Sequence, residues 1–166
     1  MFTLNCRGKL LVLEAPVIMG IINVTPDSFY KGNINDDMNH LAEKMIKDGA
    51  SILDIGGQST RPGSKRITDQ EEIKRVIPVI KKLKQNFPET IISIDTYYSK
   101  VAEAAVNAGA AIINDISAGN MDEHMLTTVA SLKVPYVCMH MQGTPDNMQN
   151  EPNYKNVVKE MLDFFV

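Results

Sequence analysis

The 166-residue sequence has no tryptophan, only two cysteines and no long apolar run. A membrane-spanning helix needs about 20 consecutive apolar residues, and the N-terminus also lacks the basic and apolar regions of a secretory signal. Cys6 and Cys138 show no paired spacing, which argues against a disulfide framework or a cysteine zinc site and favours free, buried thiols. With a formal net charge of −3 and no run of Lys and Arg, the sequence lacks an electrostatic footprint for nucleic acid. We therefore expect a cytoplasmic protein that binds small molecules and has no membrane or nucleic-acid partner.

Short runs rich in Ile, Leu, Val and Met alternate with longer segments whose apolar residues recur three and four positions apart. The short runs cover residues 17–23, 51–55, 91–95, 111–114 and 134–139. Such runs are typical of parallel strands buried on both faces, and the longer segments are typical of amphipathic helices. The pattern predicts five successive βα units in one domain, residues 1–166, after an N-terminal segment that turns at Arg7 and Gly8. It fits either a (β/α)8 barrel or a doubly wound open sheet.

Helix boundaries also have recognisable signals. Thr68, followed by Glu71 three residues later, predicts a capping box at the start of a helix. Gly49 and Gly109 stand where helices should end, because glycine adopts the left-handed conformation without a side-chain penalty.

Polar residues follow each predicted strand at its carboxyl end, where both candidate folds place their ligands. These residues are Asn23, Asp54, Asp95, Thr96, Asn114, Asp115, His140 and Gln142. Asp95 is the most informative, because a carboxylate at the mouth of a buried sheet needs a partner or a ligand. The segment 56–63 combines glycines, hydroxyls and Arg61, which suits an anion such as phosphate. The alternatives are that Asn23 is an ordinary turn residue and that 56–63 is only a flexible connection.

No motif for covalent catalysis or nucleotide binding is present. The sequence lacks a Gly-x-Ser-x-Gly elbow, a Walker loop and a Gly-x-Gly-x-x-Gly after a strand. The residues alone therefore predict an α/β enzyme that binds a polar heterocycle or a phosphorylated ligand and works by positioning and electrostatics.

Five motifs in chain order resemble the bacterial dihydropteroate synthases of folate biosynthesis. They read MGIINVTPDSF at 19–29, DIGGQSTRPG at 54–63, IDT at 94–96, IND at 113–115 and MHMQG at 139–143. The resemblance implies a (β/α)8 TIM barrel of the pterin-binding type. It also implies the condensation of 6-hydroxymethyl-7,8-dihydropterin diphosphate with 4-aminobenzoate, which gives 7,8-dihydropteroate and diphosphate. Members of this family are sulfonamide targets.

The resemblance also implies roles for individual residues. Asp95 and Asn114 hold the pterin ring, whose donors and acceptors resemble a guanine edge, and Arg61 acts with Asp95 as a catalytic residue. Thr60 contacts the diphosphate, and Asn23 helps to bind the Mg²⁺ that bridges it. Four more residues belong to the loops that close over the site: Thr25, Asp27, Ser59 and Pro62. The family resemblance suggests a homodimer.

The chain departs from the family pattern in its loops and in its length. Lys31 lies in a segment that is usually acidic, and Gln58 stands where Glu is common. The later Asp-Pro-Gly-x-Gly-Phe-x-Lys and Arg-x-His segments are absent. Because a barrel of this type takes about 250 residues, we expect this chain to be its N-terminal portion, with five of eight βα units. The alternatives are a pterin-binding piece without catalytic activity and a related pterin-binding methyltransferase domain, although the 23–29 motif favours the synthase.

Overall fold

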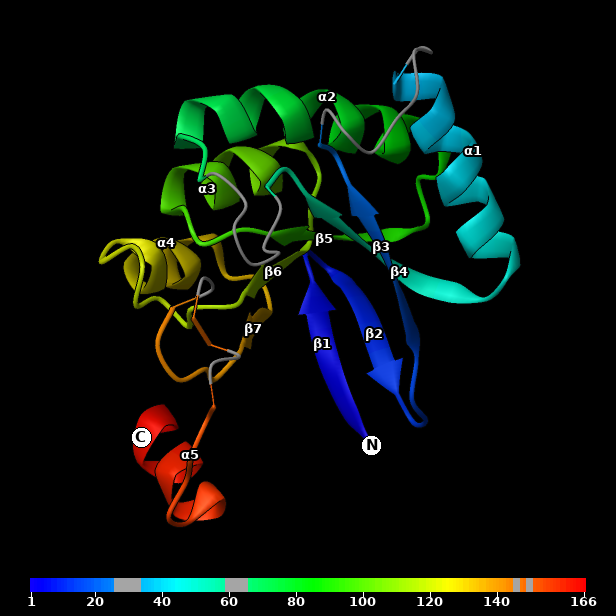
Figure 1. The fold of residues 1–166 in the computed structure, drawn as a ribbon. Helices are drawn as coiled ribbons and strands as arrows, with labels where there is room; N and C mark the ends of the chain where they lie inside the picture. The colour runs from blue at the N-terminus through cyan, green and yellow to red at the C-terminus, as the bar shows by residue number, and fades with distance from the viewer. Residues whose placement is uncertain (26–33, 59–65, 145–146, 149–150) are drawn as a thin grey trace.

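Five parallel strands form the centre of the structure, a computed structural model that describes residues 1–25, 34–58, 66–144, 147–148 and 151–166 (Figure 1). The strands are β3 (Ile18–Asn23), β4 (Ala50–Gly56), β5 (Ile91–Asp95), β6 (Ile112–Asp115) and β7 (Tyr136–Cys138). They are hydrogen-bonded in the order β3-β4-β5-β6-β7, without a reversal. A doubly wound sheet has a point where the strand order reverses. The observed order therefore favours the barrel, and the five strands form part of one.

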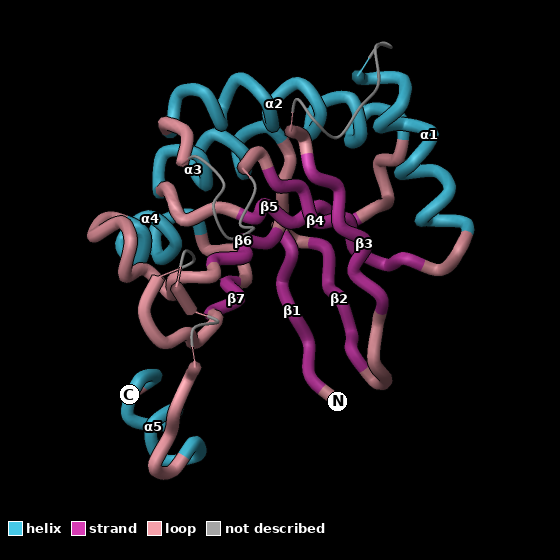
Figure 2. The backbone as a smooth tube through the Cα atoms, in the orientation of Figure 1, coloured by secondary structure: helices cyan, strands magenta, loops and turns pink. Residues whose placement is uncertain are grey.

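A helix follows each of these strands, as predicted. The helices are α1 (Ile34–Lys47), α2 (Asp69–Asn86), α3 (Ser99–Ala108), α4 (Met125–Leu132) and α5 (Val157–Phe165). Figure 2 shows α1 to α4 in an arc around one face of the sheet. Successive side chains of a strand point to opposite faces, and on β3 Ile22 is 0% exposed against these helices while Ile21 is 60% exposed on the other face. The face away from the helices is the inner face of the partial barrel.

The predicted N-terminal turn forms a hairpin of β1 (Phe2–Cys6) and β2 (Lys9–Leu13). Arg7 and Gly8, with φ values of 57° and 89°, make its tight turn. A second, smaller core joins the hairpin to the amino ends of the sheet strands through Cys6, Ile52, Ile91, Ala111 and Ile112. The hairpin therefore covers the amino end of the inner face and leaves the carboxyl ends of the strands for a ligand.

Most predicted helix boundaries are confirmed. Gly49 and Gly109 have φ values of 105° and 125° at the ends of α1 and α3. Thr68 Oγ1 accepts a hydrogen bond from Glu71 N at 3.3 Å, but the Glu71 carboxylate pairs with Arg75 Nε at 3.2 Å. The capping box is therefore formed on one side only.

Two other expectations are corrected or limited by the structure. The prediction of two buried thiols is wrong for Cys138, which is exposed at the end of β7, whereas Cys6 is buried. In the described part of the chain, no helix combines the length and apolar character needed to cross a membrane. The cytoplasmic location stays a prediction.

The last helix, α5, lies apart from the other helices in the orientation of Figures 1 and 2. Its apolar residues are largely exposed, as Val158 at 66% and Leu162 at 60% illustrate. The ring of Phe164 makes an edge contact with His140, at a centroid distance of 4.8 Å. The apolar side chains of this helix therefore face solvent.

Candidate functional site

One row of residues crosses the carboxyl ends of all five parallel strands. Register pairing aligns Asn23, Gly56, Asp95, Asn114 and Val137, and we call these residues the rim row. Adjacent strands lie about 4.8 Å apart, and aligned residues share a face. The fold thus brings together three residues predicted from the sequence, Asn23, Asp95 and Asn114, on the inner face.

Gly56 leaves a gap in the middle of the rim row. A Cβ atom at this position would lie 3.1 Å from Asn23 Oδ1 and 3.6 Å from Asp95 Oδ2. Two oxygen atoms from the neighbouring strands therefore converge over a residue that has no side chain. The space is suited to a ligand that approaches the backbone closely.

Replacing Gly56 with alanine should weaken ligand binding while sparing the fold. The added methyl group fills the space that the two oxygens share, so a ligand over Gly56 should bind more weakly by about 1 kcal/mol or more. Asn23 is exposed and can move aside, so the thermal midpoint should change little. Calorimetric titration with the pterin diphosphate that the sequence resemblance implies measures the affinity, and thermal unfolding is the control. Unchanged affinity would contradict a ligand position over Gly56.

A second row lies one step deeper and consists of Ile21, Asp54, Ser93 and Ile112; we call it the inner row. Asp54 is 3% exposed, and its Oδ2 accepts a hydrogen bond from Asn114 Nδ2 at 2.9 Å. This bond fixes the orientation of the side-chain amide of Asn114, the residue aligned with Asp95. Asp54 therefore holds one side chain of the rim row in place.

Two buried polar atoms in the inner row have unmet hydrogen-bonding capacity. Among the described residues, Asp54 Oδ1 and Ser93 Oγ are buried without a hydrogen-bond partner. The Ser93 hydroxyl lies near enough to Asp54 to lower the pKa of its carboxyl group. Ser93 Oγ and Asp54 Oδ1 nevertheless do not meet the geometry of a hydrogen bond. Unpaired buried polar atoms are rare in folded proteins. The inner row therefore offers hydrogen-bonding capacity to a polar ligand.

Burial and mutual repulsion raise the pKa values of the carboxyl groups near the strand ends. Burial, together with the negative charges of Asp54 and Asp115, raises the pKa of Asp95 to about 7. Burial also raises the pKa of Asp54, against the effect of the Asn114 amide. A ligand that donates hydrogen bonds to these oxygens would relieve the repulsion.

Asp115 does not belong to the rim, contrary to the sequence prediction. Its Oδ1 accepts from Ser117 N at 2.7 Å, and its Oδ2 accepts from Gly119 N at 2.8 Å and from Tyr136 Oη at 2.7 Å. The side chain is fully buried on the helix face, one position after Asn114 on the inner face. Its role is to hold the loop that follows β6.

Sequence reasoning missed Glu72, a buried carboxylate in the first turn of α2. Glu72 is 2% exposed, and its Oε2 accepts a hydrogen bond from Thr96 Oγ1 at 3.2 Å. Burial raises its pKa to about 7, with a smaller contribution from the charge of Asp95. A Cβ atom on Gly57 would lie only 2.7 Å from Glu72 Cγ. Acidic residues are common in the first turn of a helix, so the sequence contained no sign that this one is buried.

Several predicted site residues lie outside the described part of the chain. These are Asp27, Ser59, Thr60, Arg61 and Pro62. Thr25 is half-buried at the end of the described segment after β3. The roles expected for all six residues stay predictions.

The oxygen-rich rim suits a hard cation only in the presence of a further ligand. Among the described residues, no group of three or more His, Cys, Asp and Glu side chains could hold a metal ion. Mg²⁺ commonly keeps several waters and binds one or two protein oxygens together with substrate phosphates. Asn23 Oδ1, which converges with Asp95 Oδ2 over Gly56, fits that pattern.

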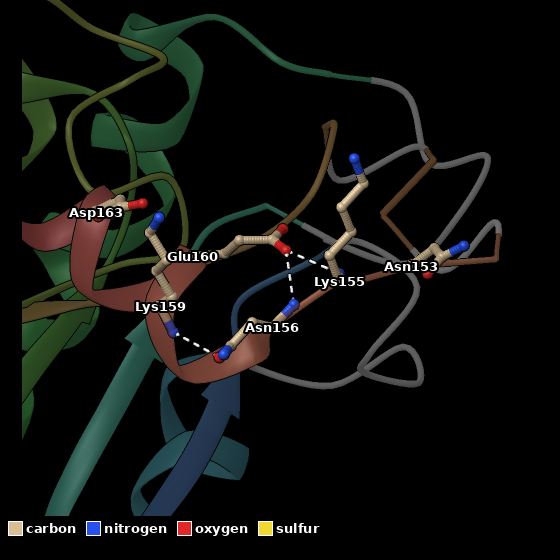
Figure 3. A pocket seen from close by; sticks show the side chains of 6 residues that line it. All are labelled: Asn153, Lys155, Asn156, Lys159, Glu160 and Asp163. Atoms are coloured by element: carbon tan, nitrogen blue, oxygen red, sulfur yellow. Dashed lines mark hydrogen bonds between the residues drawn. The ribbon is translucent and has the colours of Figure 1, made fainter.

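A hollow of about 580 Å³ lies away from the strand ends, at the start of α5 (Figure 3). Its polar groups bind one another: Glu160 Oε1 accepts from Lys155 N and Asn156 N at 2.9 and 3.1 Å. Asn156 Oδ1 accepts from Lys159 N at 3.0 Å and caps the helix. These bonds satisfy the helix terminus, and the hollow contains no residue of the rim row.

Comparison with known proteins identifies relatives along most of the chain. A family model described as "Pterin binding enzyme" matches residues 19–166. The folic acid synthesis protein fol1 of Schizosaccharomyces pombe is 51% identical over 153 residues, which are 90% of this chain and 21% of that protein.

Two solved dihydropteroate synthases share the fold. The Xanthomonas albilineans enzyme, solved with 4-aminobenzoic acid, has a TM-score of 0.85 and 41% identity, covering 98% of this chain and 58% of that one. The Yersinia pestis enzyme, solved in a sulfonamide drug complex, has a TM-score of 0.86 and 40% identity, covering 99% of this chain and 60% of that one. This chain thus spans less than two thirds of the length of these relatives. It belongs to the pterin binding enzyme family, and its structural relatives in that family are dihydropteroate synthases.

Proposed function

We propose that the protein containing this chain is a dihydropteroate synthase, which joins 6-hydroxymethyl-7,8-dihydropterin diphosphate to 4-aminobenzoate and releases diphosphate. The observation that carries the proposal is the alignment of Asp95 with Asn114, with Asp54 holding the Asn114 amide from below. Carboxylate and amide groups at the ends of parallel strands form a directed hydrogen-bonding surface for a polar ring. The identity of the relatives favours this activity over the methyltransferase alternative.

Asp95 is the group best suited to recognise the pterin ring. The amino group and adjacent ring N–H of a pterin point in the same direction, and a carboxylate can accept both hydrogen bonds. The raised pKa of Asp95 means that its charge is poorly stabilised without a ligand. Two donors from the ring would stabilise the ionised form, so binding and ionisation are coupled.

The diphosphate end of the substrate would lie toward Asn23, and the family resemblance assigns Thr60 and Arg61 to the same end. When bound, Mg²⁺ would neutralise charge on the departing diphosphate. The Asn23 amide oxygen would help to hold the ion, and the Arg61 guanidinium would bind phosphate oxygens. Departure of diphosphate from the pterin methylene carbon would leave a cation that the ring stabilises. The neutral amine of 4-aminobenzoate would then attack that carbon and lose a proton.

An assay of diphosphate release tests the proposed reaction. Pterin diphosphate and 4-aminobenzoate together should give diphosphate and 7,8-dihydropteroate in equal amounts. Pterin binding without turnover would support the alternative of a binding piece without catalytic activity, and absence of pterin binding would contradict the proposed site. Diphosphate release that depends strictly on 4-aminobenzoate would contradict a cation formed before attack.

A further inference from the structure

Gln58 connects the segment that follows β4 with the segment that follows the neighbouring strand β5. It is 8% exposed and follows Gly57 at the end of β4. Its Oε1 accepts a hydrogen bond from Ile67 N at 2.8 Å, and its Nε2 donates to Tyr97 Oη. Because the backbone N–H of Ile67 can only donate, its partner must be the amide oxygen, which leaves the amide nitrogen for Tyr97. One side chain thus joins both ends of the β4–α2 connection to the residue two positions after Asp95.

The two tyrosines that follow β5 reinforce this junction. Tyr98 Oη donates to Ile67 O at 2.7 Å and accepts from Arg66 Nε at 3.1 Å. The Arg66 guanidinium carbon lies 4.7 Å from the centre of the Tyr97 ring and 5.3 Å from that of Tyr98, within the range of a cation–π interaction. We call these five residues, Gln58, Arg66, Ile67, Tyr97 and Tyr98, the Gln58 clasp.

Thr96 connects the Gln58 clasp to the rim row. It is 3% exposed, its N–H donates to Asn114 O at 3.0 Å, and its hydroxyl accepts from Tyr98 N at 3.2 Å. The same hydroxyl donates to Glu72 on α2. The residue after Asp95 is therefore fixed to β6, to α2 and to the clasp, so a shift of the clasp would be transmitted to the strand end.

We propose that Gln58 and Tyr97 are positioning residues, which hold both ends of the β4–α2 connection against the end of β5 beside Asp95. The proposal rests on the proposed function and adds to it the residues that hold Asp95 in position for the ring. Because the clasp holds the end of β5 through Tyr97, Tyr98 and Thr96, it keeps Asp95 in place for the pterin ring. Loss of the clasp should therefore weaken binding of the pterin ring, with or without its diphosphate.

Replacing Gln58 with leucine tests the structural part of the proposal. Leucine has a similar size but makes neither hydrogen bond, so the connection should open more often. Trypsin cleavage after Arg66 under native conditions, followed by mass spectrometry, should be about tenfold faster than in the original chain. Asn86→Ala is the matched control, because it removes an exposed side-chain hydrogen bond to Asn39 at the other end of α2. Equal cleavage rates in the original chain and Q58L would overturn the proposal.

Two conservative variants separate the clasp from a general loss of stability. Q58E keeps two acceptor oxygens, one for Ile67 N and one for the Tyr97 hydroxyl, so its cleavage rate should stay within about twofold of the original. Tyr97→Phe removes one of the two bonds and should give an intermediate rate. If Q58E is cleaved as fast as Q58L while both retain the original thermal midpoint, the hydrogen bonds of the clasp are not the cause.

The binding experiment compares two ligands in the original chain and in Q58L. The ligands are the pterin diphosphate and 6-hydroxymethyl-7,8-dihydropterin, which has the ring without the diphosphate, and calorimetric titration measures the affinity for each. The affinity for both ligands should fall about fivefold or more in Q58L. Unchanged affinities would contradict the positioning role but leave the proposed function intact. If the original chain binds neither ligand, the proposed function fails, and the cleavage experiment still tests the clasp.

Discussion

Asp95→Asn should lower the affinity for pterin diphosphate by about 2 kcal/mol or more, which is roughly thirtyfold. Asparagine has nearly the same shape, so the rim row should keep its geometry. It offers one acceptor oxygen in place of two and has no charge to strengthen the hydrogen bonds from the ring. Calorimetric titration measures the effect. Asp163→Asn is the matched control, because Asp163 is an exposed carboxylate on α5.

The dependence of this affinity on pH gives a second test of the same residue. Asp95 has a raised pKa of about 7 without a ligand, and the ring must bind to its ionised form. In the original chain the affinity should therefore rise between about pH 6 and pH 8. In Asp95→Asn this rise should be much smaller. If Asp95→Asn and the original chain bind the ligand equally well at pH 6 and at pH 8, the assignment of Asp95 to the ring is wrong.

The alternation of strand residues explains why much of the site could be predicted from the sequence. Asn23, Asp95 and Asn114 each end an apolar run, and parallel pairing places them in one row. Ser93 could have been found by the same rule, since it lies two positions before Asp95 on the same face. The prediction of Asp115 as a rim residue was wrong because the rule was not applied there: adjacent residues of a strand face opposite sides.

Contacts between distant segments could not be predicted in this way. Gln58 was identified only as a residue of the second motif that stands where Glu is common, and its bond to Tyr97 joins positions 39 residues apart. Neither residue has an unusual local pattern. Their association depends on the packing of two loops, which is set by the order and register of the strands and not by local sequence. The same holds for the burial of Glu72 under Gly57.

Glu72→Gln should stabilise the fold at high pH and have a smaller effect at low pH. Glu72 is almost fully buried, and its pKa in the folded chain is about 7, above its ordinary value of 4.5. The folded state therefore binds this proton more tightly than the unfolded state. The stability that this proton contributes is complete below about pH 4.5 and is lost as the pH rises through 7. Glutamine has no charge to bury, and its oxygen can still accept the hydrogen bond from Thr96.

The free energy of unfolding of Glu72→Gln, relative to the original chain, should thus increase by about 2 kcal/mol between pH 5 and pH 8. Urea unfolding followed by far-ultraviolet circular dichroism at the two pH values measures this difference. Glu103→Gln, an exposed substitution on α3, controls for the general change in net charge. If the free energies of unfolding of Glu72→Gln and the original chain differ by the same amount at pH 5 and pH 8, Glu72 has an ordinary pKa and is ionised in the folded chain. Its carboxylate would then be stabilised in place by Thr96, Gly57 and Arg75 to a degree that compensates for its burial.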